Sequence, residues 1–262
     1  MAVQSIMHLL ASSGLLLVIV LAMIIQPIRA NYCQFWSPDC IDPLAQTAVP
    51  FNFEPLYPDP LYLFYAFDAS TDGSTGQPVT KTSFWLRYGG TRVNRVAING
   101  NRTLEIAMRV GNLTGYPAGG HNACEYVLGS QCTETITQTL QYGIYGHILS
   151  GQNYTNPLAT ILTQMQMYTP ANFSCSPYFF DVQSFPAISF ASEISSPQSV
   201  EMQSSGSTNS PWATWYTHDL TSASQSDQVA VAIVSRSPAY GWTTPPSLSD
   251  IQVELVCIQA PS

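Results

Sequence analysis

Charged residues are scarce in this chain, and lysine is almost absent. Asp, Glu, Lys and Arg together make up 9 % of the residues, against roughly 25 % in ordinary soluble domains. Lys81 is the only lysine in the sequence. Binding to nucleic acid or to an anionic membrane surface depends on clustered Lys and Arg. We therefore expect neither nucleic acid nor an anionic membrane surface among the partners.

Several motifs of catalysis and metal binding are also missing. The sequence contains no Gly-x-Ser-x-Gly nucleophile elbow and no Cys-x-x-Cys pair. His121, His147 and His218 lie far apart and lack the spacing of metal-binding histidine motifs. His218 and Asp219 are adjacent, so on an extended chain they point in opposite directions and do not predict a catalytic triad. These patterns predict no metal site and no cofactor.

The longest apolar run lies near the start of the sequence. Residues 15–25 are continuously apolar, and a break with a proline follows before the small residue Ala30. This run is shorter than the roughly 20 residues that a membrane-spanning helix needs, and Ala30 suits a cleavage site. We predict a signal peptide at residues 1–30, with a membrane anchor formed by residues 6–25 as the alternative. Cleavage would change the net charge from −8 to −9 and leave no membrane contact.

Four Asn-x-Ser/Thr sequons follow the leader. They begin at Asn101, Asn112, Asn153 and Asn172, and none has proline in the middle position. Because the transferase and the glycan both need room, we expect these asparagines at the surface. The sequence therefore predicts a secreted, N-glycosylated extracellular protein.

All six cysteines also lie after the leader. An even number of cysteines in an exported chain predicts disulfides rather than a metal site. Nearness in sequence favours one bond between Cys33 and Cys40 and another between Cys124 and Cys132. Cys175 and Cys257 would then close a long loop, although other connectivities remain open. The cysteines are Cys33, Cys40, Cys124, Cys132, Cys175 and Cys257.

Strand-like runs of aromatic and β-branched residues dominate the chain. Residues 31–60 are rich in proline, which excludes helix and predicts an extended strap over the core. Residues 228–234 are apolar on both alternating faces, as in a strand covered on both sides. The Asn99-Gly100 pair predicts a hairpin turn, and the serine-rich residues 195–210 predict an exposed loop. The runs are 61–67, 82–88, 92–98, 103–110, 179–182, 188–190, 228–234 and 251–258.

The periodicity changes to that of a helix in the middle of the chain. Apolar residues recur at four-residue intervals within 133–149, and a second helix is expected from Pro157, with Asn156 as its N-cap. The stripes are Ile136, Leu140, Ile144 and Ile148, then Leu158, Ile161, Leu162 and Met165. We predict an α+β, mostly β fold. It is an antiparallel β-sandwich-like domain at 61–262 with a two-helix insertion at about 133–167.

Aromatic residues in the C-terminal part are the candidate ligand-binding residues. Trp and Tyr on loops offer large faces to carbohydrate or protein ligands, although the same residues also fill the ends of β-sandwiches. We therefore expect a binding protein or a structural or host-interaction protein rather than an enzyme, with a carbohydrate or an extracellular protein as ligand and the oligomeric state left open. The candidates are Trp212, Trp215, Tyr216, Tyr240 and Trp242.

A carbohydrate-active hydrolase is the alternative function, because such an enzyme needs only two suitably placed carboxylates. Asp181, Glu193, Glu201 and Asp219 are its candidate residues. Residues 68–73 match the opening of a calcium loop, but Val79 stands where a bidentate Glu is needed, so we expect a plain turn there.

Part of the chain resembles uncharacterised, cysteine-bearing secreted proteins of filamentous fungi. The resemblance rests on the stretch from His121-Asn-Ala-Cys124 through Cys132, on Asn156-Pro157-Leu158, and on Cys175-Ser-Pro177. It covers residues 95–190. The resemblance implies an extracellular location, and it implies no activity and no functional residue.

Overall fold

The computed structural model describes residues 33–54, 57–71, 76–88, 102–168, 175, 179–193, 200–241 and 246–261. The chain separates into Met1–Cys33 and Gln34–Ser262, and the second unit contains the strands and helices described below. The predicted signal peptide lies outside the described residues, so its cleavage stays a prediction. Among the described helices, none combines the length and the apolar character that crossing a membrane requires.

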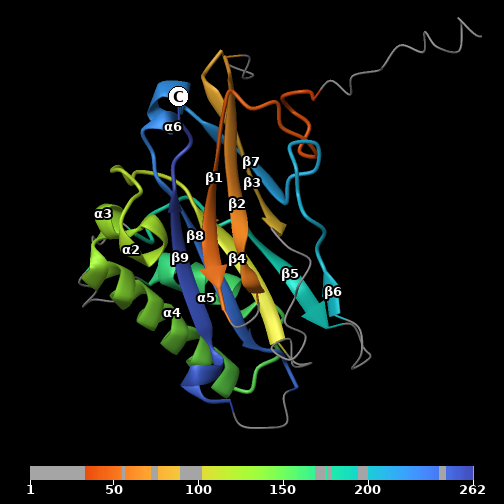
Figure 1. Cartoon of the computed structure of the whole chain (residues 1–262), viewed down its shortest axis with the longest axis vertical. Coiled ribbons are helices and arrows are strands. Elements are labelled where there is room, and N and C mark those ends of the chain that lie inside the picture. Colours follow the sequence, from red (N-terminus) through yellow and green to blue (C-terminus); the bar gives the residue numbers. More distant parts are fainter. Residues whose placement is uncertain are drawn as a thin grey trace, which may run out of the picture. The chain divides into compact units, whose positions relative to one another are not determined.

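The described strands form two antiparallel sheets (Figure 1). Four strands belong to the first sheet: β1 Ala45–Phe53, β2 Tyr57–Ser70, β3 Val79–Tyr88 and β7 Ala213–His218. Five belong to the second: β4 Arg102–Arg109, β5 Ala187–Glu193, β6 Val200–Met202, β8 Ala230–Pro238 and β9 Gln252–Ile258. The spatial orders are β1-β2-β3-β7 and β6-β5-β4-β8-β9.

The helical segments lie mainly between β4 and β5 in the sequence. They are α2 Gly120–Ala123, α3 Glu125–Leu128, α4 Ser130–Leu149 and α5 Pro157–Met167, followed later by α6 Ser222–Ser226 and the short 3₁₀ helix η1 Leu248–Asp250. The two longer helices, α4 and α5, are the predicted two-helix insertion. The predicted fold class, a β-sandwich-like α+β domain, is confirmed.

Apolar residues from the facing sides of the two sheets form one buried core. Leu63 and Tyr65 of β2 pack in the same cluster as Ile106 of β4 and Val234 of β8, and all are essentially inaccessible to solvent. Successive side chains of a strand point to opposite faces, so alternate residues of each strand supply this core.

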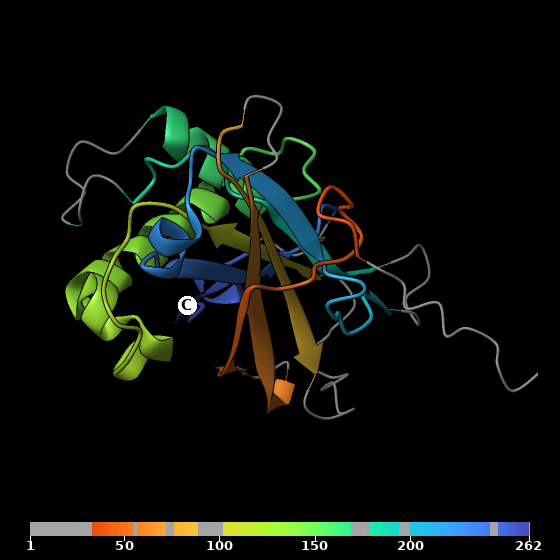
Figure 2. The same cartoon turned by 90° about the horizontal axis from the view of Figure 1, so that it is seen from above.

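A second core lies between the second sheet and the helices (Figure 2). Ile136 and Leu140 of α4 and Leu162 of α5 are completely buried there, as the four-residue periodicity predicts. Gly143 lets the two helices approach closely, because a Cβ at this position would lie 2.8 Å from Cγ2 of Ile161.

Strand β8 is covered on both faces, as predicted. Val231 and Ile233 belong to the core under the helices, whereas Ala232 and Val234 belong to the core between the sheets. β8 also lies between β4 and β9. It is therefore the central strand of a layer that is buried on both sides.

Several segments differ from the prediction, and β7 is one that the sequence pattern does not indicate. Within the expected strap, residues 45–53 form β1, which pairs with β2. Residues 179–182 are not a strand, although Phe179 and Phe180 are buried. The expected serine-rich loop contains β6, and its Gly206 lies so close to β3 that a Cβ there would clash with Cβ of Trp85. The expected strand 92–98 and the Asn99-Gly100 turn lie outside the described residues.

The disulfide pairing expected from nearness in sequence is wrong for four cysteines. Cys124 is bonded to Cys257, and Cys132 is bonded to Cys175. The two remaining cysteines, Cys33 and Cys40, are also disulfide-bonded, as expected. Cys124 follows the short helix α2 and packs beside the last strand, so its partner is set by the fold of the whole domain rather than by sequence distance.

Candidate functional site

The structure does not gather the described aromatic candidates at one site. Trp212 is 8 % exposed, its ring stacks on Phe190, and its indole N–H donates to the carbonyl of Ser204 at 2.8 Å. Trp212 is therefore a core residue, and its assignment as a ligand-binding residue is wrong. Tyr240 is 54 % exposed and lies edge-on to Tyr154.

The other aromatic candidates have different surroundings. Tyr216 donates its hydroxyl to the carbonyl of Phe35 at 3.0 Å and packs against Trp36, which is 50 % exposed. Trp215 is half-buried on β7, and its ring meets Phe84 edge-on. Trp242 lies outside the described residues, so its assignment stays a prediction.

Trp215 lines a small cavity, and polar side chains from three other segments of the chain also line it. We call it the Trp215 pocket, and its volume is about 260 Å³. Its polar residues offer both hydrogen-bond donors and acceptors, and Asp181 adds a carboxylate. The lining residues are Val110, Gly111, Asn112, Asp181, Val182, Gln183, Ser184, Trp215, Thr217, Leu220 and Gln228.

A buried arginine lies behind this pocket. Arg109, the last residue of β4, is completely buried and donates to the carbonyl of Phe179 at 2.8 Å and to that of Gly111 at 2.6 Å. Its third contact is a 2.8 Å hydrogen bond to Oδ1 of Asn112. Burial lowers the pKa of Arg109 to about 10, and the nearby Asp181 carboxylate opposes this shift. Arg109 thus fixes the two loops that form one wall of the pocket.

A larger hollow runs between α4 and the edge strand β9. We call it the α4–β9 groove, and its volume is about 560 Å³. It is mostly polar, it contains two carboxylates, and none of its lining residues is basic or aromatic. The lining residues are Ser130, Gln131, Thr133, Glu134, Thr137, Gln138, Gln141, Val253, Glu254 and Leu255.

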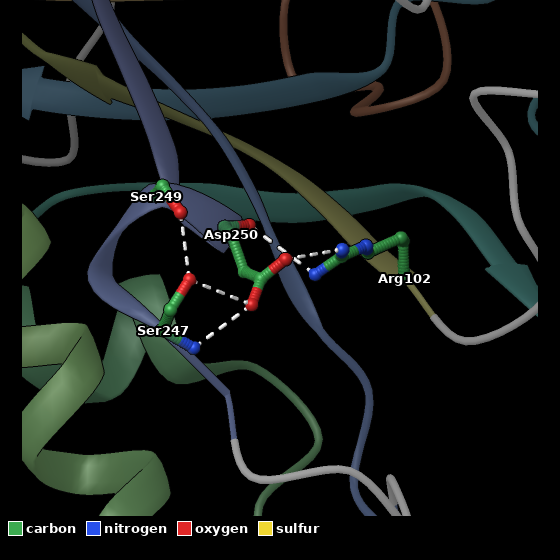
Figure 3. Close-up of polar contacts among 4 residues, drawn as sticks. All are labelled: Arg102, Ser247, Ser249 and Asp250. Atoms are coloured by element: carbon green, nitrogen blue, oxygen red, sulfur yellow. Dashed lines mark hydrogen bonds and ion pairs between the residues drawn. The ribbon is translucent and has the colours of Figure 1, made fainter.

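An ion pair fixes the entry of the chain into β9 (Figure 3). Nη2 of Arg102 on β4 lies 2.8 Å from Oδ1 of Asp250, which ends η1. The other carboxylate oxygen of Asp250 accepts from the backbone N–H of Ser247 at 2.8 Å. These hydrogen bonds lower the pKa of Asp250, the bond from the Ser247 backbone contributing most. The pair thereby holds the start of β9, and with it one end of the groove.

A buried carboxylate positions the second helix of the insertion. Glu105 on β4 is 1 % exposed and accepts from the backbone N–H groups of Leu158 at 2.9 Å and Ala159 at 3.3 Å. Asn156 occupies the N-cap position of α5, as predicted, but its side chain makes no capping hydrogen bond, and the Glu105 carboxylate caps the helix instead. Burial raises the pKa of Glu105 to about 7, although the two backbone hydrogen bonds oppose this shift.

The carboxylates expected for a hydrolase lie on separate elements. Glu193 ends β5, Glu201 lies in β6, and Asp219 follows β7. Asp181 is the one of the four that lines the Trp215 pocket. Within the described ranges, no three His, Cys, Asp or Glu side chains are arranged to hold a metal ion. Residues 72–75 of the calcium-like loop lie outside the residues that the structure describes.

No protein-family model, curated protein or solved structure matches this chain.

The two hollows depend on residues that the sequence pattern does not connect. The sequence also indicates a polar face on α4, opposite in character to its apolar face. Its residues recur at helical spacing: Gln131, Glu134, Gln138 and Gln141. The strand that forms the other side of the groove, β9, lies more than a hundred residues later in the sequence. No local sequence pattern therefore predicts the groove.

Proposed function

We propose that this chain is a secreted, N-glycosylated extracellular protein that binds an extended segment of another protein in the α4–β9 groove. The leader pattern, the sequons and the disulfides support export. Asn112 and Asn153, the two described sequon asparagines, are exposed as glycosylation requires. The observation that carries the binding proposal is the edge strand β9 beside a polar groove.

The position of β9 supports a peptide as the ligand. Among the described strands, β9 is last in the order of the second sheet, so its strand neighbour β8 lies on one side only. A strand has backbone N–H and C=O groups on both edges, and an extended peptide uses such an edge to join a sheet. Val253, Glu254 and Leu255 of β9 line the groove. A bound segment would therefore lie along these three residues.

The helix supplies the side-chain contacts. Gln131, Glu134, Gln138 and Gln141 lie on one face of α4, and amide side chains both donate and accept hydrogen bonds. Glu134 and Glu254 make the groove anionic, which favours a segment that contains Lys or Arg. A carbohydrate fits this groove less well, because its wall has no aromatic face for a sugar ring.

Peptide selection followed by charge reversal tests the proposal. Short peptides would be selected by phage display on the secreted protein, and their affinity measured by calorimetry. We expect selected peptides to be basic and to lose about tenfold or more in affinity for E134K/E254K, since exposed ion pairs contribute up to about 1 kcal/mol each. The matched control D39K/D59K reverses two exposed charges outside the groove and should bind as the native protein does.

Two results would contradict the proposal. One is a failure to select any peptide against the native protein. The other is an equal affinity of the selected peptides for E134K/E254K and for D39K/D59K, because binding would then not involve the groove.

A further inference from the structure

One sequon asparagine, Asn112, lies on the wall of the Trp215 pocket. Asn112 is exposed and is also one of the residues that line this cavity. A glycan on Asn112 would therefore begin at the rim of the pocket. This geometry matters only for a glycosylated chain, so the inference below rests on the secreted, glycosylated part of the proposed function and not on the groove.

Arg109 determines how the amide of Asn112 is turned. A guanidinium has donors and no acceptor, so the atom of Asn112 that faces it must be Oδ1. The 2.8 Å bond from Nη2 of Arg109 thus leaves Nδ2, the atom that carries an N-glycan, turned away from the guanidinium. Because Arg109 is buried and is also bonded to Phe179 and Gly111, this orientation is held by the core.

The pocket has the chemistry that the first sugar of an N-glycan requires. This sugar, N-acetylglucosamine, has one apolar ring face, several hydroxyls and an acetamido N–H. The Trp215 indole offers a surface to the apolar face, and Asp181 accepts hydrogen bonds. Gln228 also lines the pocket, and its buried Oε1 has no hydrogen-bond partner among the described residues.

The size of the pocket limits its occupant. Its volume of about 260 Å³ is smaller than that of sites for drug-sized ligands, which start at about 300 Å³. It therefore suits one sugar ring rather than an oligosaccharide. We infer that the Trp215 pocket holds the first N-acetylglucosamine of a glycan carried by Asn112 of the same chain. The glycan then becomes part of the folded structure and covers Trp215.

Asn153 provides a matched comparison. It is exposed in the segment between α4 and α5, and it lines neither the Trp215 pocket nor the α4–β9 groove. A glycan on Asn153 would therefore begin outside both of these hollows. Thr114 and Thr155, the sequon hydroxyl residues, are both exposed, so each can be replaced by alanine while its asparagine is kept.

The test compares T114A with T155A in protein secreted from eukaryotic cells. Mass spectrometry of glycopeptides should find glycans on Asn112 and Asn153 of the native chain. We expect the melting temperature of T114A to lie about 2–4 °C below that of the native protein, a shift typical of a modest stabilisation in a domain of this size. The melting temperature of T155A should equal that of the native protein. Trimming with an endoglycosidase that leaves one N-acetylglucosamine should preserve the native melting temperature.

A second pair of variants separates sugar binding from a general effect of the sequon. If the sugar contacts Trp215, T114A should have no further effect on the melting temperature in a W215L background. The acrylamide quenching of tryptophan fluorescence should also rise in T114A and not in T155A, because the sugar no longer covers Trp215.

The possible failures are distinguishable. If both asparagines carry glycans but T114A melts and quenches like T155A, or if only Asn153 is glycosylated, the inference about the pocket is wrong and the proposed secretion stands. If neither asparagine is glycosylated in the secreted protein, the glycoprotein part of the proposed function is wrong, and this inference with it.

Discussion

Two buried charged residues of β4 connect the second sheet to the segments that cover it. Glu105 caps α5, and Arg109 holds the loops at residues 110–112 and 179. The two residues are four positions apart on one strand, so their side chains point to the same face. The sequence shows both as ordinary members of a strand-like run. Their roles become visible only when α5 and the loop before β5 are placed against that face.

The carboxyl group of Glu105 should make stability depend on pH. Its pKa in the folded protein, about 7, lies above its ordinary value of 4.5. The folded state therefore holds this proton more tightly than the unfolded state does. The stabilisation by this group is fully present below pH 4.5 and is lost as the pH rises to about 7. The resulting loss in the free energy of unfolding is about 3 kcal/mol.

Urea unfolding of the native protein and of E105Q at a series of pH values measures this effect. The difference in unfolding free energy between the two proteins should shift in favour of E105Q as the pH rises from 4.5 to 7, since glutamine carries no proton to lose. A difference that stays constant over this range would show that Glu105 does not titrate as described.

At the scale of secondary-structure elements, prediction succeeded where a local pattern determines the element. Helix α4 and strand β8 follow directly from apolar spacing, because their buried residues recur with the period of the element itself. The strand β7 was not predicted, because its residues look like an aromatic loop until β3 pairs with them. The same limit applies to the start of α5, where Asn156 is the N-cap residue but the capping hydrogen bonds go to the Glu105 carboxylate.

The disulfides connect elements that are distant in sequence, and their removal should reflect that distance. Cys124 and Cys257 are 133 residues apart, whereas Cys132 and Cys175 are 43 apart. On the chain-entropy model these bonds contribute about 5 and about 4 kcal/mol respectively. We therefore expect C124A/C257A to lose more unfolding free energy than C132A/C175A.

Urea unfolding of the two double variants measures the order of stability. Peptide mapping of the native protein without reduction tests the pairing itself. A cross-linked peptide that joins Cys124 to Cys132 would contradict the pairing and restore the one expected from sequence distance.

At the scale of the whole domain, both hollows lie where segments far apart in sequence meet. The α4–β9 groove joins a helix of the insertion to the last strand, and the Trp215 pocket joins β7 to the loops after β4 and before β5. Composition and cysteine number predicted a disulfide-bonded sandwich, since such properties act over the whole chain. They did not predict the hollows, because Asp181 and Trp215 become neighbours only when the two sheets pack against each other.

Hydrogen–deuterium exchange of β9 tests the proposed binding most directly. A peptide selected on the secreted protein would be added, and exchange of the backbone amides of Gln252–Ile258 followed by mass spectrometry. If the peptide joins the sheet, amides of β9 should exchange more slowly in the complex, while those of β1, one of the two terminal strands described in the other sheet, keep their rates. A peptide that binds without slowing exchange in β9 would contradict the account.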